Sequence, residues 1–175
     1  MNLLSLADLI EQYCWDEKSG LYHNVDPNTM KPFPIPAWTS WCPALFGFAK
    51  PDRLERVVHD NILNPEHFLR PHGLTSLAVS NLLCNQSPRG LYGRVIVCNW
   101  QGPVWVLPNV LAVRMLLRMG LKSEAKDIAS RVVSVMVQDL EEKGTLHENY
   151  DCETGAGLWA PQFMSWNILA LELID

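Results

Sequence analysis

The fold is decided by Gly144-Thr145-Leu146-His147-Glu148-Asn149-Tyr150-Asp151-Cys152-Glu153-Thr154-Gly155 and the following Ala160-Pro161-Gln162-Phe163-Met164-Ser165-Trp166-Asn167. The first part is rich in residues that favour turns, so it predicts a loop between two helices that presents Glu148. Four aromatic residues surround this acid: Tyr150, Trp159, Phe163 and Trp166. Such a site suits a sugar, because aromatic rings stack on C–H faces while amides and acids bind the hydroxyls. Residue type alone equally allows Glu148 to be a helix cap or a solvated charge.

A family resemblance favours the functional interpretation. The patterns Glu-Asn-Tyr-Asp-x-x-Thr-Gly and Ala-Pro-x-Phe-x-Ser-Trp resemble the C-terminal signature of six-hairpin glycosidases of the glycoside hydrolase family 63 type. That group includes processing α-glucosidase and mannosylglycerate hydrolase, with trehalase more distant. The resemblance implies that Glu148 is the catalytic general base. It also implies an (α/α)6 toroid, whose loops form the site at one rim.

A second motif, Asn99-Trp100-Gln101-Gly102-Pro103-Val104-Trp105, resembles the family's Asn-Trp-Arg/Gln-Gly-Pro-Val-Trp segment at the mouth of the barrel. It implies that Trp100, Gln101, Gly102 and Trp105 contact substrate, together with Tyr150 and Trp166 of the first motif. Gln101 stands where the family commonly has arginine. Gly102 permits close backbone approach, and Pro103 suits the start of a helix. Trp105 could instead pack beneath that helix.

Two further segments resemble the same family. Arg70-Pro71-His72-Gly73-Leu74-Thr75-Ser76 is similar to a loop that borders the sugar pocket, which implies that His72 and Gly73 bind substrate. Trp15-Asp16-x-x-x-Gly20-x-Tyr22 is similar to the family's hairpin insert. The turn Lys18-Ser19-Gly20 and the alternation after it predict a β-hairpin within residues 15–26, and a second turn follows at Asp26-Pro27-Asn28-Thr29.

The remaining periodicity predicts alternating inner and outer helices, and together with the resemblance it implies an all-α partial (α/α)6 toroid, with residues 1–175 as a single partial domain. An amphipathic helix is expected over residues 3–15, and others over 38–49 and from 51 to about 63. Residues 109–119 are nearly all apolar, which predicts an inner helix. Ser123 should cap an outer helix that runs to about Leu140 with Leu140 inward, and Met164 to Ile174 should be inner again. Residues 81–96 have no clear pattern.

Composition excludes several classes. The 48% hydrophobic and 19% charged content over 175 residues is that of an ordinary globular domain. A net charge of −5 argues against nucleic acid, and no apolar run is long enough for a membrane span. The N-terminus lacks a basic start, and five scattered cysteines favour free thiols, so a cytoplasmic location is expected. No cofactor or metal is expected, because Asp151-x-Glu153-x-Gly155 lacks the other ligands of a calcium loop.

The sequence lacks one expected part. An inverting glycosidase needs a general acid as well as a base, and the family's acidic segment has no match here. The resemblance covers only the C-terminal half of the family's catalytic domain. Asp16, Asp26 and Asp60 are the only substitutes worth testing. We therefore expect a homo-oligomer or a missing N-terminal half, acting on an oligosaccharide or small glycoside by hydrolysis of an α-glucosidic or α-mannosidic bond with inversion.

Two other functions remain open at this stage. Without the acid, the chain could be a non-catalytic carbohydrate-binding or structural helical module. An epimerase or isomerase on the same toroid would use rim histidines, for which His23, His72 and His147 are available.

Overall fold

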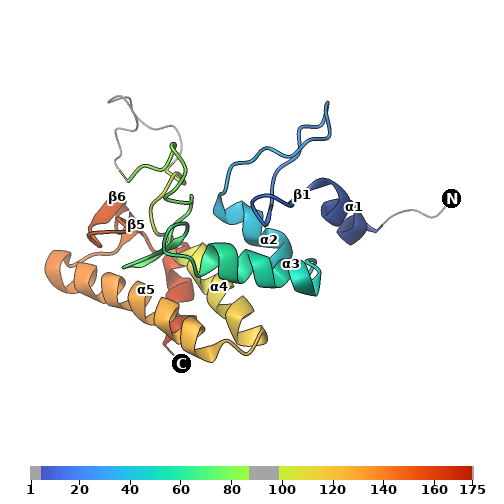
Figure 1. Cartoon of the computed structure of the whole chain (residues 1–175). Helices are drawn as coiled ribbons and strands as arrows, with labels where there is room; N and C mark the ends of the chain where they lie inside the picture. The colour runs from blue at the N-terminus through green and yellow to red at the C-terminus, as the bar shows by residue number, and fades with distance from the viewer. Residues whose placement is uncertain (1–4, 87–98, 175) are drawn as a thin grey trace.

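The computed structural model describes residues 5–86 and 99–174, and most of its regular structure is helical (Figure 1). The helices are α1 (Leu6–Tyr13), η1 (Trp38–Trp41), α2 (Cys42–Leu45), α3 (Pro51–Arg56), η2 (Val57–Ile62), α4 (Val106–Arg118), α5 (Lys122–Lys143) and η4 (Trp166–Leu173). The strands form three antiparallel pairs: β1 (Trp15–Asp16) with β2 (Leu21–Tyr22), β3 (Leu69–Arg70) with β4 (Gly73–Leu74), and β5 (His147–Tyr150) with β6 (Gly157–Pro161). The expected predominance of helices and the short hairpin near residues 15–26 are confirmed.

The N-terminal helix and hairpin form as their sequence predicts. Ser5 caps α1, and its hydroxyl accepts a hydrogen bond from the backbone N–H of Asp8 while the Asp8 carboxylate accepts from the Ser5 N–H. Glu11, on the inner side of α1, accepts hydrogen bonds from the Tyr22 hydroxyl at 2.6 Å and from the Lys50 N–H at 3.0 Å. This one buried carboxylate therefore joins α1 to hairpin β1–β2 and to the start of α3.

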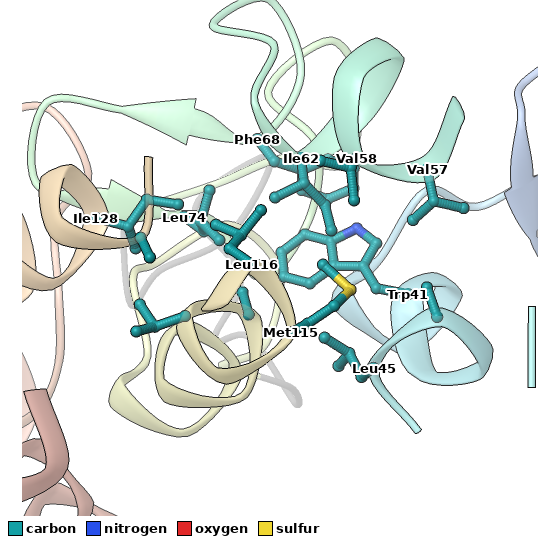
Figure 2. Packing of buried hydrophobic residues seen from close by; sticks show 14 of the residues in the cluster. Trp41, Leu45, Val57, Val58, Ile62, Phe68, Leu74, Met115, Leu116 and Ile128 are labelled. Carbon is teal, nitrogen blue, oxygen red and sulfur yellow. The ribbon is translucent and has the colours of Figure 1, made fainter. Parts of the chain in front are cut away.

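The larger hydrophobic core lies between α2, η2, α4 and the first turns of α5. Trp41 is fully buried and meets Phe68 edge to face, with ring centroids 4.6 Å apart. Figure 2 shows its indole surrounded by side chains of η2 and α4, including Ile62 and Met115. The expected helix over 38–49 is shorter, since α2 ends at Leu45, whereas the one from 51 to about 63 has the expected extent. Both are mixed in type: a 3₁₀ turn precedes α2, and α3 continues as a π-helical turn.

The helix pair α4–α5 agrees with its expected positions, but two details are wrong. α5 begins at Lys122 with Leu121 as its N-cap residue, so Ser123 lies inside the helix and does not cap it. Leu140 is 53% exposed, whereas Asp139 takes the buried place on that turn because its carboxylate binds His147. Gly144 ends α5 in the left-handed conformation, φ 68°, that glycine adopts without strain.

The three motif segments are joined by backbone pairing. Val104 forms antiparallel bridges to both Thr75 and Tyr150. The Val104 N–H donates to the Tyr150 carbonyl at 2.8 Å, and the Tyr150 N–H donates back at 3.0 Å. The segment Gly102–Trp105 is thus a central strand-like link between hairpins β3–β4 and β5–β6.

Asn109 fastens this link from the first turns of α4. Its side-chain oxygen accepts from the Leu74 N–H at 2.7 Å, and its amide donates to the carbonyls of Leu74 at 3.0 Å and Trp105 at 2.7 Å. Asn109 is fully buried, and a Cβ on the neighbouring Gly73, φ 135°, would come within 3.0 Å of its oxygen. The site segments therefore depend on one amide and on the absence of a side chain at Gly73.

The C-terminal segment differs from the expected inner helix. η4 is a 3₁₀ helix, and in the described part of the chain only Asn167 and Ala170 of its residues are buried. Between η4 and α5 runs an apolar groove of about 240 Å³, and a second groove of about 670 Å³, partly polar, shares Val133 and Ile174 with it. Large apolar side chains are exposed here: Leu117, Val137, Leu140, Met164, Ile168, Leu171 and Ile174. An inner helix needs a second layer, and no described segment covers this side.

Replacing Asn109 by Ala should destabilise the protein by about 2–4 kcal/mol, because it leaves the buried N–H and C=O of Leu74 without partners. Chemical denaturation monitored by circular dichroism would measure the free energy of unfolding. Asn24→Ala is the matched control, because Asn24 is exposed, and its effect should stay within about 0.5 kcal/mol. Equal effects of the two substitutions would contradict the role given to Asn109.

Candidate functional site

Glu148 lies in strand β5, and the expectation that it lies in a loop is wrong. The pairing of β5 with β6 shifts register around it: His147 faces Pro161 and Asn149 faces Leu158, which leaves Trp159 and Ala160 opposite Glu148. Trp159 takes up this irregularity with a left-handed backbone, φ 60°, that is strained for a tryptophan. Bulges of this kind bend a strand and redirect a side chain, and they are common beside active sites.

The Glu148 carboxylate is partly buried, and within residues 5–86 and 99–174 it makes no hydrogen bond or ion pair. Other carboxylates nearby are occupied. Asp151 accepts from the N–H groups of Glu153 and Thr154 in the hairpin turn, and Glu153 pairs with Arg70. Glu148 is thus available to bind a ligand or a water molecule, whereas Asp151 and Glu153 serve the fold. Their engagement also argues against the calcium loop.

Five aromatic rings gather beside this strand. Trp100 stacks on Trp105 with ring centroids 3.8 Å apart and planes 8° from parallel. Trp166 lies 6.1 Å from each of them, Phe163 packs 5.9 Å from Trp166, and Trp38 packs 5.5 Å from Trp100. The structure therefore brings together Trp100, Trp105 and Trp166, which come from two motifs far apart in the sequence. Trp105 is buried, whereas Trp100 and Trp166 are partly exposed.

Gly102 lies in a crowded part of the backbone. Its φ is 143°, and a Cβ there would come within 2.6 Å of the Gln86 amide nitrogen and 2.9 Å of the Cys84 sulfur. Its N–H donates to the Ser76 hydroxyl at 3.1 Å. Gln101 is partly exposed, and its carbonyl accepts from the Asn85 N–H. Gly102 therefore sets the path of the segment, and Gln101 has a side chain free enough to reach a ligand.

His72 and Gly73 belong to hairpin β3–β4. His72 lies in its turn and packs against Gly155 in the turn of hairpin β5–β6, whereas Gly73 is the first residue of β4. Gly73 is enclosed by Asn109, Val104 and Val132. The role of His72 and Gly73 as substrate contacts stays a prediction.

Tyr150 is fully buried in the smaller hydrophobic core. Burial raises the pKa of its phenol well above the usual range, and the nearby Asp139 carboxylate adds to that effect. Its hydroxyl is a buried group without a hydrogen-bond partner among the described residues. Tyr150 aligns β5 through its backbone pairing with Val104. Whether it also lines the pocket stays a prediction.

The three substitute acids have other tasks. Hydrogen bonds from Ser19 lower the pKa of Asp16, and a hydrogen bond from the Asn28 backbone lowers that of Asp26. Asp60 pairs with Arg56 at 3.4 Å. A general acid needs a raised pKa so that it carries a proton near neutral pH, so Asp16 and Asp26 do not fit that role.

The histidines and cysteines of the described ranges form no cluster of metal ligands. His23 is buried against Ser19 and the Ile35 carbonyl, and burial lowers the pKa of its imidazole. His147 binds Asp139. No group of three or more potential metal ligands occurs in the described ranges, and Cys14, Cys42, Cys84 and Cys152 are free thiols. Cys98 lies outside the described residues, as does most of the unpatterned stretch 81–96.

In the described ranges no helix combines the length and apolarity needed to cross a membrane.

Sequence reasoning missed Asp139, Asn167 and Trp38. Asp139 binds the His147 N–H at 3.0 Å and its ring nitrogen at 2.8 Å. Asn167 donates to the His147 carbonyl at 2.8 Å. A signal existed for Asp139, because it continues the buried i, i+3, i+4, i+7 series that starts at Val132 and is the one acid in that stripe. Nothing local marked Asn167 or Trp38.

Comparisons with known proteins identify the family and the fold. The model of the mannosylglycerate hydrolase MGH1-like glycoside hydrolase domain matches residues 3–166. The structure is similar to the GH63 mannosylglycerate hydrolase from Thermus thermophilus in complex with glucose, at 21% identity and a TM-score of 0.71, over 91% of this chain and 36% of that one. It is also similar to the same enzyme in complex with Tris and D-glycerate, at 22% identity and a TM-score of 0.70, over 91% and 34%.

Neutral trehalase Nth1 from Saccharomyces cerevisiae is similar at 20% identity and a TM-score of 0.72, over 97% of this chain and 29% of that one. This chain therefore spans about a third of the length of these solved structures. At sequence identities this low, the similarity shows a shared fold only. The family match extends over nearly the whole sequence, including both motifs. The chain belongs to the MGH1-like glycoside hydrolase domain family, and it has the partial toroid fold of the GH63 glycosidases.

Proposed function

We propose that this chain contributes the general-base half of an inverting glycosidase site, with Glu148 as the base. The observation that carries the proposal is the Glu148 carboxylate itself. It is partly buried at a strand irregularity, unpaired in the described parts of the chain, and carried by a strand hydrogen-bonded to the tryptophan segment. A carboxylate without a partner can accept a proton from water, whereas an ion-paired one is far less able to do so.

The aromatic side chains suit the substrate class. Trp100 and Trp166 retain exposed surface and can stack on the C–H face of a pyranose ring, while Gln101 can bind a hydroxyl. Trp105 stacks on one face of Trp100 and holds this ring in place. A small α-glucoside or α-mannoside is the substrate we propose. The glucose and D-glycerate bound in the T. thermophilus enzyme support that choice, because they are the parts of a small glycoside.

The reaction requires a second carboxyl group. In an inverting glycosidase, the base activates water on one face of the sugar while an acid about 6.5–9.5 Å away protonates the leaving oxygen. Asp16, Asp26 and Asp60 are engaged elsewhere, so we propose that the acid comes from a second polypeptide segment. That segment belongs either to a second copy of this chain or to a further part of the same protein. In both cases residues 1–175 form one partial domain. The exposed apolar groove between α5 and η4 supports such an association.

A second candidate function is carbohydrate binding without catalysis. It is favoured by one observation: of the three candidate acids, Asp16 and Asp26 have lowered pKa values and Asp60 is ion-paired with Arg56. In that case the tryptophan cluster would retain affinity for sugar while the chain alone hydrolyses nothing.

Replacing Glu148 by Gln should lower kcat for α-glucoside or α-mannoside hydrolysis by about 10²–10⁴-fold, because the amide cannot accept the proton from water. Release of free sugar measured enzymatically would check this. Glu141→Gln is the matched control, since Glu141 is exposed on α5 and should keep full activity. Activity that survives Glu148→Gln would show that the base lies elsewhere.

Replacing Trp100 by Ala should raise the Kd for a monosaccharide ligand about ten-fold, which corresponds to about 1.4 kcal/mol, because a stacking surface is lost. Isothermal titration calorimetry with methyl α-glucoside would measure it. Phe46→Ala removes an aromatic side chain that is 60% exposed at the end of α2, and it should leave binding unchanged. Unaltered affinity in Trp100→Ala would remove the tryptophans from the site.

Association through the apolar groove can be tested on the isolated chain. We expect light scattering to give at least a dimer, and the double substitution Val137→Glu and Ile168→Glu to give a monomer, because charges would enter the groove. Leu6→Glu, also on an exposed apolar residue but on α1, should leave the dimer intact. A wild-type monomer would contradict self-association and direct the search for the acid to another part of the protein.

A further inference from the structure

We infer that Asp139 and Asn167 are positioning residues that fix the direction of Glu148, an inference that rests on the role proposed for Glu148. Both bind the backbone of His147, the residue directly before it. Asp139 accepts from the His147 N–H at 3.0 Å, and the Asn167 amide donates to the His147 carbonyl at 2.8 Å. The two residues come from α5 and η4, so the peptide leading into Glu148 is held from two sides by separate helices.

These two hydrogen bonds are needed because the ladder between β5 and β6 is interrupted at Glu148. In a regular antiparallel pair, cross-strand hydrogen bonds fix each residue in turn. The shift between His147 and Asn149 places two residues of β6 opposite Glu148 and breaks that series. At His147 the side chains of Asp139 and Asn167 bind the backbone groups in place of the partner strand: the Asp139 carboxylate accepts from the N–H, and the Asn167 amide donates to the carbonyl.

The holding side chains are themselves rigidly placed. Asp139 is 5% exposed, and its carboxylate also contacts the His147 ring nitrogen at 2.8 and 3.1 Å. Asn167 is 3% exposed and donates a second hydrogen bond to the Phe163 carbonyl at 3.0 Å. Any side chain at Gly157 would overlap the His147 ring and approach the Asp139 carboxylate. The glycine at this position therefore permits the close contact on which the arrangement depends.

The two side chains act on the backbone that leads into Glu148. In the described ranges Asp139 and Asn167 hydrogen-bond to neither Trp100 nor Trp105, and these two rings stack on each other in a separate segment. Loss of either residue should thus misdirect the base while substrate is still bound. A displacement of about 1 Å is enough to lower the rate of a positioned reaction about 100-fold.

The kinetic test compares Asn167→Ala and Asp139→Ala with Asp139→Asn, which keeps an oxygen acceptor for the His147 N–H. Both alanine variants should lower kcat about 10- to 100-fold with KM within about threefold of wild type, and Asp139→Asn should recover most of the rate. Gln138→Ala, a change on the exposed face of the same helix turn, should have no effect. Equal kcat in wild type and Asn167→Ala, in a folded variant, would overturn the inference.

A second measurement needs no turnover. The carboxyl ¹³C signal of Glu148, identified by its loss in Glu148→Gln, should move toward that of an exposed glutamate in Asn167→Ala and Asp139→Ala, and the Glu148 amide should exchange at least ten-fold faster. Amides of α4 should keep their exchange rates, which shows that the fold persists. An unmoved signal with unchanged exchange would overturn the inference. If the wild-type protein hydrolyses no glycoside, the proposed function fails, and this measurement still decides whether Asp139 and Asn167 hold Glu148.

Discussion

The antiparallel pairing of Val104 with Tyr150 is the interaction on which the rest of the site depends. It joins the segment that carries Trp100 and Trp105 to the strand that carries Glu148, and Val104 is bridged on its other side to Thr75. Asn109 then ties Leu74 and Trp105 to the start of α4. Three motifs separated by long stretches of sequence thereby meet in a few residues of extended backbone. Helices supply the core, but backbone pairing brings the functional side chains together.

Much of the fold could be predicted from the sequence, because helical periodicity and turn residues act locally. The hairpin at Trp15–Tyr22 and the helix pair α4–α5 follow from spacing alone, and the family was recognisable from the Glu-Asn-Tyr motif. The numerous turn residues after Glu148 predict a loop there. That prediction is wrong because β5 is stabilised by Val104, a partner 46 positions earlier that no local pattern reveals.

The same limit applies to the site. Glu148 and the tryptophans could be named from motifs, whereas Asp139 and Asn167 act through contacts with His147 that span eight and twenty positions. The prediction for Leu140 fails for a related reason. The buried stripe of α5 ends at Asp139, because its carboxylate binds the His147 N–H, and Leu140 lies outside that stripe. The expected inner position of η4 presumes a second helical layer. Its exposed apolar face in this chain indicates where that layer would pack.

The chain combines Glu148, the base in our proposal, with an exposed apolar groove between α5 and η4, as the proposal of a divided site requires. Sugar binding is the property common to the hydrolase and its non-catalytic alternative, so we would measure it first. Two-dimensional ¹H–¹⁵N NMR during titration with methyl α-glucoside should shift the indole signals of Trp100 and Trp166 and the amide of Glu148. Signals of hairpin β1–β2 should stay in place. Shifts confined to the separate cavity of about 320 Å³ beside His23 and Arg56, or no shifts at all, would contradict a carbohydrate site at Glu148.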